Sequence, residues 1–440
     1  MPTAPLHALL ARHGGAAGLA AAVRGGEVAA AEPVRAARER IAALDPALHA
    51  FTQVLEATGP ATGGGSGLEL AGLPVAVKDN IDVAGTVTTL GRPVGERPPA
   101  ARDAEAVARL RGAGAVVVGK TNLPELASLA VTVNAHHGDA RNPWDPDRTA
   151  GGSSGGSAVA VASGMAAAAL ATDTGGSALI PAALTGVCGF RPTHGRIGLD
   201  GVAPLSPSMD TVGVIASHPA DIAAVVRVLD GETGESPAAP GLKGLRVGVL
   251  TGWFQDEASD GVLARVHQAV RGLVSAGASA RPAETPSAHL VLRHARTIYR
   301  AETAASFAGL VQPGRSYAPA VEARRTNPHG PADLARARAF REAWRAELLS
   351  AFADADVLIA ATTPITAPRL DAPENEATTA LIRHAYPFCL AGVPVLSVPA
   401  GLDGGLPVGL MLAAPPGEDH RLLALGAVCH DAGLFTHSDT

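Results

Sequence analysis

Short runs of apolar residues alternate with segments of helical periodicity through most of this chain. Such runs, with no polar residue at every second position, are typical of strands that are buried on both faces of a sheet. They predict strands at residues 73–77 (LPVAV), 115–119 (AVVVG), 245–250 (LRVGVL) and 356–363 (DVLIAATT), and a strand end within 394–401 (PVLSVPAG). The alternation predicts an α/β fold around a largely buried sheet.

Helical periodicity dominates the N-terminal segment, residues 1–62. LHALLARH and EPVRAARERIAALDPALHAF carry apolar residues at helical spacing, and Pro33 suits the start of the second helix. A Gly-rich stretch at 63–67 (GGGSG) predicts a flexible link into the main body. We therefore expect helices before the core.

Three segments within residues 68–225 have helical patterns. They are AEAVARLRGAG, which ends at Gly112 or Gly114, LPELASLA, and SAVAVASG, which precedes a strand in AAAALATD. Because strands and helices alternate here, this region is the expected catalytic core.

The remaining sequence predicts how the rest of the chain is arranged. Residues 255–350 are mainly helical, rich in Arg and Ala, and broken near 327–331, which indicates a helical cap or insertion. Residues 355–430 are expected to return to the core sheet, so that 1–440 forms a single domain.

Composition narrows the classes of function. The formal net charge is -6 and Lys and Arg form no block, so nucleic-acid binding has no electrostatic support. The three cysteines are too far apart for a CxxC metal pair or a disulfide framework, which favours a reduced, cytoplasmic setting. No signal peptide is expected, and the most apolar stretch, 158–171, is too short and too interrupted to span a membrane.

Two Gly/Ser loops lie close together in the core, GGSSGGS at 151–157 and TDTGGS at 172–177. Gly lets the backbone approach a ligand closely, and N–H groups at a helix start stabilise an anion. The pair therefore suits a serine nucleophile and its oxyanion hole, the alternative being two flexible loops.

A serine nucleophile needs a base, and neither loop contains His. Of the 35 Lys and Arg residues only three are Lys, and one of them, Lys78, ends the apolar run LPVAV. Burial there would lower its pKa and favour the neutral amine, a state that Arg does not reach. The ordinary alternative is a lysine that extends to water.

Three other patterns are weaker. GAVVVGKT, 114–121, fits the P-loop pattern, but its middle is expected to be a strand and not a phosphate-binding loop. GGSSG, 151–155, fits the nucleophile elbow of α/β-hydrolases, but no apolar strand precedes it. His136, His137 and Asp139 could suggest a metal site, yet no second cluster supports it.

Together these segments resemble the amidase signature family. The resemblance runs through LAGLPVAVKDNIDVAG, AVARLRGAGAVVVGKTNLPELA, RNPWDPDRTAGGSSGGSAVAVASG, ATDTGGSALIPAALTGVCGFRPTHGRI and PFCLAGVPVLSVPAG, with 75 residues from Lys78 to Ser153 and 24 from Ser153 to Ser177. It implies a mixed central β-sheet covered by helices on both faces.

The resemblance also implies roles for individual residues. Ser177 corresponds to the acyl-forming nucleophile, Ser153 to a bridging serine that follows a cis peptide bond, and Lys78 to the base. The backbone N–H groups of Thr174, Gly175, Gly176 and Ser177 correspond to the oxyanion hole. No metal or organic cofactor is implied.

Two departures from the family pattern bear on the substrate. Leu179 stands where the family usually has Arg, which favours a neutral or aryl/alkyl substrate over an acidic one, and Met411 replaces a usual Gln. Asp173, Arg191 and Asp210 correspond to structural positions. VTVNAHHG, 131–138, resembles a segment of arylacetamide and indoleacetamide hydrolases.

The first expectation for function is therefore an amidase that hydrolyses a small carboxamide and releases ammonia or an amine. One alternative is the glutaminase subunit of a tRNA-dependent amidotransferase, and another is an esterase or acyl-transfer relative. The expected partner is the small-molecule amide alone, with no nucleic acid and no membrane, and the N-terminal helices could mediate a homodimer.

Overall fold

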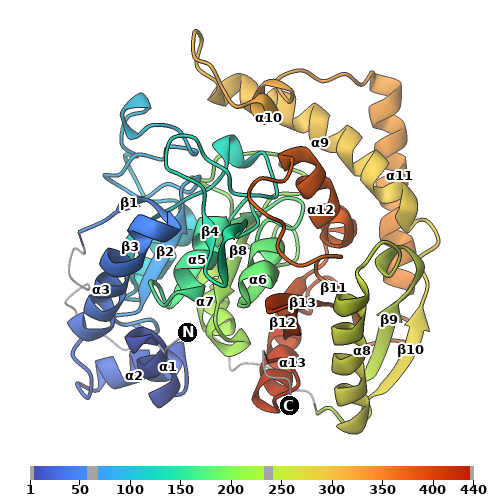
Figure 1. Ribbon diagram of the computed structural model, residues 1–440, viewed down its shortest axis with the longest axis horizontal. Coiled ribbons are helices and arrows are strands. Elements are labelled where there is room, and N and C mark those ends of the chain that lie inside the picture. Colours follow the sequence, from blue (N-terminus) through green and yellow to red (C-terminus); the bar gives the residue numbers. More distant parts are fainter. Residues whose placement is uncertain (1–3, 57–67, 232–240, 437–440) are drawn as a thin grey trace.

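A mixed sheet of eleven strands runs through the molecule (Figure 1). The structure is a computed structural model and describes residues 4–56, 68–231 and 241–436, so the predicted link at 63–67 lies outside the described residues. The strand order is β1-β3-β2-β6-β8-β7-β12-β13-β11-β9-β10.

The strands of this sheet include every strand that the apolar runs predict. Their bounds are β1 (Phe51–Val54), β2 (Pro74–Lys78), β3 (Val116–Thr121), β6 (Ala168–Asp173), β7 (Cys188–Arg191), β8 (Thr211–Ala216), β9 (Arg246–Leu250), β10 (Ser279–Ala283), β11 (Val357–Ala361), β12 (Val395–Asp403) and β13 (Leu406–Ala413). A separate two-stranded sheet pairs β4 (Arg141–Asn142) with β5 (Asp145–Thr149).

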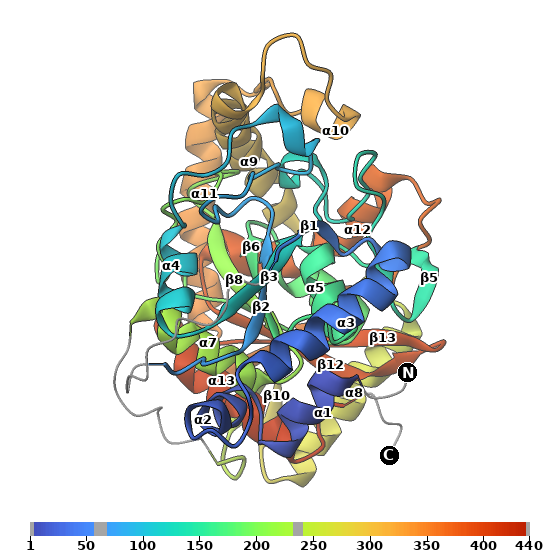
Figure 2. The same cartoon turned by 90° about the vertical axis from the view of Figure 1, so that its left-hand side faces the viewer.

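Helices cover both faces of the sheet, as expected for the α/β class (Figures 1 and 2). They are α1 (Pro5–Arg12), α2 (Ala16–Arg24), α3 (Ala31–Leu48), α4 (Glu105–Gly112), α5 (Gly155–Ala162), α6 (Leu179–Thr185), α7 (Pro219–Asp230), α8 (Asp260–Ser275), α9 (Ala288–Leu310), α10 (Pro319–Glu322), α11 (Pro331–Ser350), α12 (Glu374–Ala391) and α13 (Asp419–Asp431). Short 3-10 turns span Val94–Glu96, Glu125–Ala127 and Gly252–Phe254.

The two faces can be told apart along one strand, because successive strand residues point to opposite sides. Val75 and Val77 of β2 pack in the cluster that contains Ile222 of α7, and this face is covered by α4, α7, α8 and α13. Ala76, between them, packs in the cluster of Val159 from α5, on the face that α3, α5 and α6 cover. Both faces of β2 are therefore buried, as its unbroken apolar run predicts.

The register of β2 positions the functional region. This strand runs parallel to both β3 and β6, with Val77 opposite Leu170 of β6. Parallel strands present their carboxyl ends at the same edge of a sheet. Lys78 at the end of β2 and the TDTGGS loop at the end of β6 are thus brought to one edge.

One part of the N-terminal prediction is wrong. The helix expected through residue 51 ends at Leu48, and Phe51–Val54 is strand β1, antiparallel to β3. His49 has a φ of 52°, and the Asp45 carboxylate accepts hydrogen bonds from the N–H groups of Ala50 (2.7 Å) and Phe51 (3.1 Å). These bonds turn the chain out of the helix and into the sheet.

The helix predicted for LPELASLA, 123–130, is also wrong, since only a 3-10 turn at Glu125–Ala127 forms there. Long-range hydrogen bonds win over local helical preference. The Glu125 carboxylate accepts from Arg92 (3.1 Å) and from the N–H of Ala318 (2.7 Å), and Leu126 N–H donates to Leu90 O (2.8 Å). A regular helix could not make these three contacts at once.

Residues 255–350 are mainly helical, as predicted, but they also contain β10, which pairs in parallel with β9 at the sheet edge. In Figure 1, α9 and α11 lie side by side above and beside the sheet, with α12 next to α9. The division of the chain into core, cap and C-terminal return stays a prediction.

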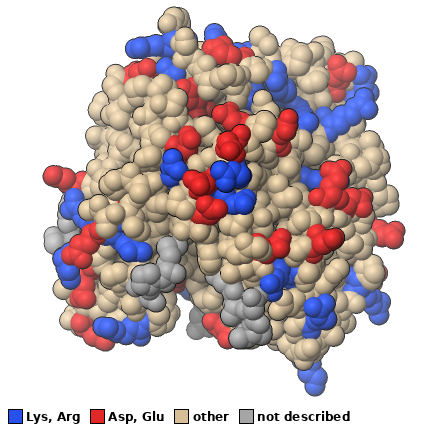
Figure 3. Space-filling view, viewed as in Figure 1, with Lys and Arg blue, Asp and Glu red and all other residues tan. Residues whose placement is uncertain are grey.

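On the face seen in Figure 3, acidic and basic side chains lie interspersed among larger areas of uncharged residues. Among the described residues, no helix is both long enough and apolar enough to cross a membrane. Cys188, Cys389 and Cys429 are buried free thiols.

Candidate active site

Lys78, at the end of β2, has a side chain with no exposed surface. Its Nζ atom lies 2.7 Å from Ser153 Oγ and 2.9 Å from Thr172 Oγ1, with Thr172 O at 3.5 Å. The parallel pairing of β2 and β6 accounts for the contact with Thr172, which lies 94 residues away in sequence. Among the described residues, Lys78 forms no ion pair, so its only polar contacts are neutral oxygens.

Burial in this setting changes the protonation of Lys78. Desolvation lowers the pKa of its amine from 10.5 to about 7, although the carboxylates of Asp173 and Asp210 oppose the shift. A group with that pKa is partly uncharged at neutral pH, and an uncharged amine can accept a proton.

The hydrogen bonds around Thr172 orient the amine. Thr172 Oγ1 accepts from Lys78 and from Asn80 Nδ2 at 3.0 Å, which occupies both lone pairs of that hydroxyl oxygen. The N–H groups of a neutral Lys78 can therefore be directed at Thr172 Oγ1 and Thr172 O. Its lone pair is left for the hydroxyl of Ser153.

The loop that carries Ser153 is held by its surroundings. The Gly152–Ser153 peptide bond is cis, as the resemblance implies. A Cβ at Gly152 would lie 2.8 Å from the carbonyl carbon of Val131, so only Gly fits there. Thr132 Oγ1 donates to Gly151 O (2.8 Å) and accepts from Gly155 N–H (3.1 Å). These contacts fix the loop that carries Ser153.

The loop that carries Ser177 is organised by Asp173. The Asp173 carboxylate accepts from the N–H groups of Gly176 (2.9 Å) and Ala178 (2.7 Å), on either side of Ser177. Arg191 Nη1 in turn donates to Asp173 Oδ1 (2.8 Å), and both side chains are completely buried. This agrees with the structural role inferred for Asp173 and Arg191.

Two further contacts tie the site together. Ser154 N–H donates to Ser177 O at 3.2 Å, so the two Gly/Ser loops are directly joined. Thr174 Oγ1 donates to Asp210 Oδ1 at 2.6 Å, and Asp210 also accepts from the backbone N–H groups of residues 205 and 206. Asp210 is thus a structural anchor for the second loop.

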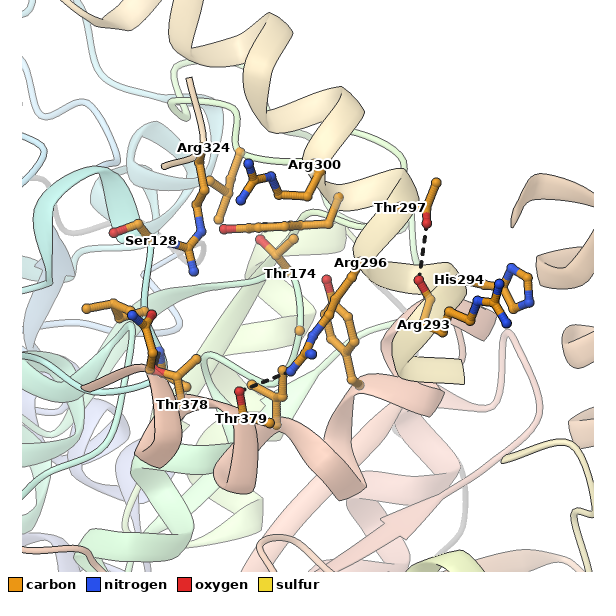
Figure 4. Close-up of a pocket in the computed structure, with 18 of the residues that line it drawn as sticks. Ser128, Thr174, Arg293, His294, Arg296, Thr297, Arg300, Arg324, Thr378 and Thr379 are labelled. Atoms are coloured by element: carbon orange, nitrogen blue, oxygen red, sulfur yellow. Dashed lines mark hydrogen bonds between the residues drawn. The ribbon is translucent and has the colours of Figure 1, made fainter. Parts of the chain in front are cut away.

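Ser177 opens onto a cavity of about 750 Å³, which Gly175 and Thr174 also line. Thr174 is labelled in the close-up of the cavity in Figure 4. Ser177 is half-buried, whereas Ser153 and Lys78 are buried. The order from solvent inward is therefore Ser177, Ser153, Lys78. Only the first of the three hydroxyl and amine groups is positioned to meet a molecule in the cavity.

The backbone N–H groups near Ser177 do not all have the same status. Gly176 N–H is already bonded to Asp173, whereas those of Thr174, Gly175 and Ser177 have no acceptor within the described part of the chain. A Cβ at Gly175 would lie 2.1 Å from the ring of Tyr386, so Gly lets this loop pack directly against that ring. The three unbonded N–H groups are available to a developing oxyanion.

The two residues that depart from the family pattern, Leu179 and Met411, pack in the core. Leu179 and Met411 are both fully buried and belong to the same apolar cluster. Neither side chain is among those that line the cavity. Leu179 therefore supplies core packing at the start of α6.

The weaker patterns do not form sites. Val116–Thr121 is strand β3, so the P-loop pattern contains a strand, and Lys120 Nζ is paired with Asp79 at 2.8 Å. GGSSG follows β5, which belongs to the small sheet and not to the central one. His136 bonds to Glu125 (2.8 Å) and His137 to Arg92 O (2.9 Å), so the two rings do not converge.

Sequence reasoning missed several residues that shape this site. Asn80 lies in the motif that contains Lys78, and Thr172 lies in the motif that contains Ser177. Their polar side chains, so near these residues in sequence, could have indicated a role in the site. Thr132 and Tyr386 gave none, because their contacts with the Gly/Ser loops depend on how distant segments pack.

Similarity to known enzymes extends over nearly the whole chain. A family model described as Amidase matches residues 32–423. A glutamyl-tRNA(Gln) amidotransferase subunit of Roseiflexus castenholzii is 34% identical, over 91% of this chain and 92% of its own. The protein of the same name from Thermus thermophilus is 35% identical, over 95% of this chain and 97% of its own.

Solved structures agree on the fold. One solved chain belongs to a protein complex described as vestigial, which reveals the evolutionary origins of an s-triazine catabolic enzyme. It has a TM-score of 0.84 and 31% identity, and the match covers 96% of this chain and 99% of that one. Peptide amidase from Stenotrophomonas maltophilia has a TM-score of 0.79 and 30% identity, and the match covers 97% of this chain and 98% of that one.

Proposed function

The chain belongs to the amidase signature family and is a hydrolase of C–N amide bonds, and we propose that it acts on a small carboxamide through an acyl-enzyme on Ser177. The observation that carries this proposal is the 2.7 Å contact between Lys78 Nζ and Ser153 Oγ in a fully buried setting. It supplies a base for a serine whose own loop contains no histidine.

In the proposed mechanism, Ser177 Oγ attacks the amide carbonyl carbon and passes its proton to Ser153 Oγ. Ser153 gives its own proton to the neutral amine of Lys78. The N–H groups of Thr174, Gly175 and Ser177 stabilise the oxyanion.

The same relay works in reverse to complete the reaction. The proton returns from Lys78 through Ser153 to the leaving nitrogen, and ammonia or an amine departs. Water then attacks the acyl-enzyme with the same base, and the carboxylic acid is released. No step requires a group other than these side chains, the backbone and water.

A second candidate is the glutaminase subunit of a tRNA-dependent amidotransferase. It is favoured by relatives of that name that are 34–35% identical over most of the chain. Ammonia release that is specific for glutamine and that requires a co-purified partner protein would support it. An esterase remains an outcome of the assay, because esters pass through the same acyl-enzyme.

The proposal is tested by measuring ammonia release from aryl, alkyl and amino-acid amides. We expect Ser177→Ala to lower kcat by at least about a thousandfold, since the nucleophile is lost. Ser275→Ala, at the exposed end of α8, is the matched control and should keep normal activity. Near-normal turnover by folded Ser177→Ala would refute the nucleophile assignment.

A further inference from the structure

The cavity onto which Ser177 opens is rich in arginine. Five arginines line it, from α9, the turn after α10, and α11: Arg293, Arg296, Arg300, Arg324 and Arg336. Asp333 is the only carboxylate among the lining residues of this cavity, and it is ion-paired with Arg336. The cavity therefore carries an excess of positive charge.

The other four arginines lack a carboxylate partner. Within the described residues, none of Arg293, Arg296, Arg300 and Arg324 forms an ion pair, although Arg325, in the same turn as Arg324, pairs with Glu322 (2.8 Å). Their charge is left for solvent or for a ligand to neutralise.

Neutral acceptors hold two of these side chains in place. Arg296 Nη2 donates to Thr379 Oγ1 of α12 at 3.0 Å, and Arg324 Nη1 donates to Ala320 O at 2.5 Å. Each guanidinium has N–H groups beyond those used here. The side chains are positioned without losing their charge or all of their donors.

Arg300 holds the backbone of the turn that follows α10. It donates to the backbone oxygens of Ala323 and Thr326, which places the turn that carries Arg324. Burial and the neighbouring charge of Arg324 lower the pKa of Arg300. Two like charges are thus held close together, an arrangement that an anion between α9 and this turn would relieve.

Tyr386 links these arginines to the reacting centre. Its ring packs on Gly175, in the loop that carries Ser177, and lines the same cavity. Burial raises the pKa of the Tyr386 hydroxyl well above its usual value, and the charges of Arg296 and Arg324 oppose that shift. In Figure 4, Arg296 and Arg324 lie on the side of Thr174, whereas Arg293 and His294 lie farther along α9.

We propose that this cavity selects amides whose acyl part ends in a carboxylate, such as the monoamide of a dicarboxylic acid, with Arg296 and Arg324 as the residues that bind it. The inference rests on the proposed function, because it concerns the substrate of the same site. Arg binds a carboxylate through paired, charge-assisted hydrogen bonds.

The same wall disfavours a zwitterion. An α-ammonium group, as in glutamine, would meet arginines and an aspartate that is already paired. Leu179 led to the expectation of a neutral substrate, but the positive charge that a carboxylate needs is supplied from α9 and the turn after α10 instead.

The test compares four amides of similar size: glutaramate and adipamate, which carry a carboxylate, neutral pentanamide, and glutamine. We expect kcat/KM for the better anionic amide to exceed that for pentanamide by about tenfold or more, and added salt to reduce this preference. Equal kcat/KM values for pentanamide and the better anionic amide, or a higher kcat/KM for glutamine, would overturn the proposal.

Variants locate the effect. Arg296→Gln and Arg324→Gln should each raise KM for the anionic amide by about tenfold and change that for pentanamide by less than about twofold. Arg325→Gln, next to Arg324 but paired with Glu322 and outside the cavity lining, is the matched control. Equal losses on charged and neutral amides would contradict a role in charge recognition.

A binding measurement separates this inference from the proposed function. Calorimetry with glutaramate and Ser177→Ala needs no hydrolysis. Binding that Arg296→Gln weakens would support the inference even if wild type hydrolysed none of the four amides. Hydrolysis of pentanamide without binding of glutaramate would support the proposed amidase function and contradict the inference of an anionic substrate.

Discussion

Lys78 and Lys120 are two buried lysines on neighbouring strands with different surroundings. Lys120 Nζ pairs with the Asp79 carboxylate at 2.8 Å, and both side chains have no exposed surface. Lys78 contacts only the hydroxyls of Ser153 and Thr172 and one carbonyl oxygen. Neutral oxygens in a dry site favour the uncharged amine of Lys78, the pKa of which burial lowers. The two lysines are therefore suited to different roles, Lys120 to a structural one and Lys78 to a catalytic one.

At the residue scale, we predict that activity follows the titration of Lys78. Because its pKa is lowered to about 7, the amine is protonated below that pH and cannot act as a base. The kcat/KM should fall by about tenfold for each pH unit below the pKa and level off above it. A pH–rate profile with a neutral amide measures this directly.

The matched variants for this prediction use the chain's few lysines. Lys78→Arg should be inactive at every pH, because a guanidinium keeps its proton. Lys243→Arg, on the exposed surface, should keep the wild-type profile. A profile that stays flat through neutral pH, or an active Lys78→Arg, would argue against Lys78 as the base.

The residues that could be anticipated were those that the motifs contain. Lys78, Ser153 and Ser177 stand at motif positions, and the structure brings Lys78 into contact with Ser153. Thr172 lies within a motif, but no role could be predicted for it, because its contact with Lys78 requires β2 and β6 to pair across 94 residues. A sequence pattern identifies a reactive side chain more readily than the side chain that orients it.

At the scale of elements, local patterns predicted strands better than the segments between them. Each apolar run that was predicted to be a strand became one, because burial on both faces needs only that composition. LPELASLA failed because Glu125 and Leu126 are bound by Arg92 and Leu90, which are distant in sequence. The hairpin of β4 and β5 lacks an apolar run and was not anticipated.

Helix α12 carries a buried group that should make the fold sensitive to acid. His384 has no exposed surface, its Nδ1 lies 3.0 Å from Ala361 O, and its Nε2 has no partner among the described residues. Burial lowers the pKa of His384 from 6.5 to about 3. The unfolded chain therefore takes up this proton first as the pH falls.

We predict a loss of stability between pH 6.5 and 3 from this one group, amounting to about 2 kcal/mol by pH 5. Urea unfolding at pH 7 and pH 5 measures it. His384→Gln should lose less stability over this range than wild type, and His267→Gln, exposed on α8, should behave as wild type. An unchanged pH dependence in His384→Gln would contradict the assignment.

At the scale of the whole molecule, the strand order and the cavity wall lay beyond sequence reasoning. Strands β7 and β12 are neighbours although some two hundred residues separate them, and no local pattern encodes that pairing. The sequence identified 255–350 only as mainly helical and rich in Arg. Arg296 and Arg324 line the same cavity as Ser177 because of how α9 and the turn after α10 lie over the core.

The same scale explains why family membership leaves the substrate open. In the proposed mechanism the core strands and the two Gly/Ser loops supply the reacting groups, whereas α9, the turn after α10, and α12 supply much of the cavity wall. Relatives with different printed names share the fold at 30–35% identity. Changes in the wall can therefore alter the substrate without altering the chemistry.

The central claim is that Lys78 activates Ser177 through Ser153, and covalent labelling tests it most directly. The measurement is the rate and site of modification by a fluorophosphonate, read by peptide mass mapping in wild type and Lys78→Met. We predict a label on Ser177 in wild type and a rate at least about a hundredfold lower in folded Lys78→Met. A label on another residue, or equal rates in the two proteins, would contradict the account.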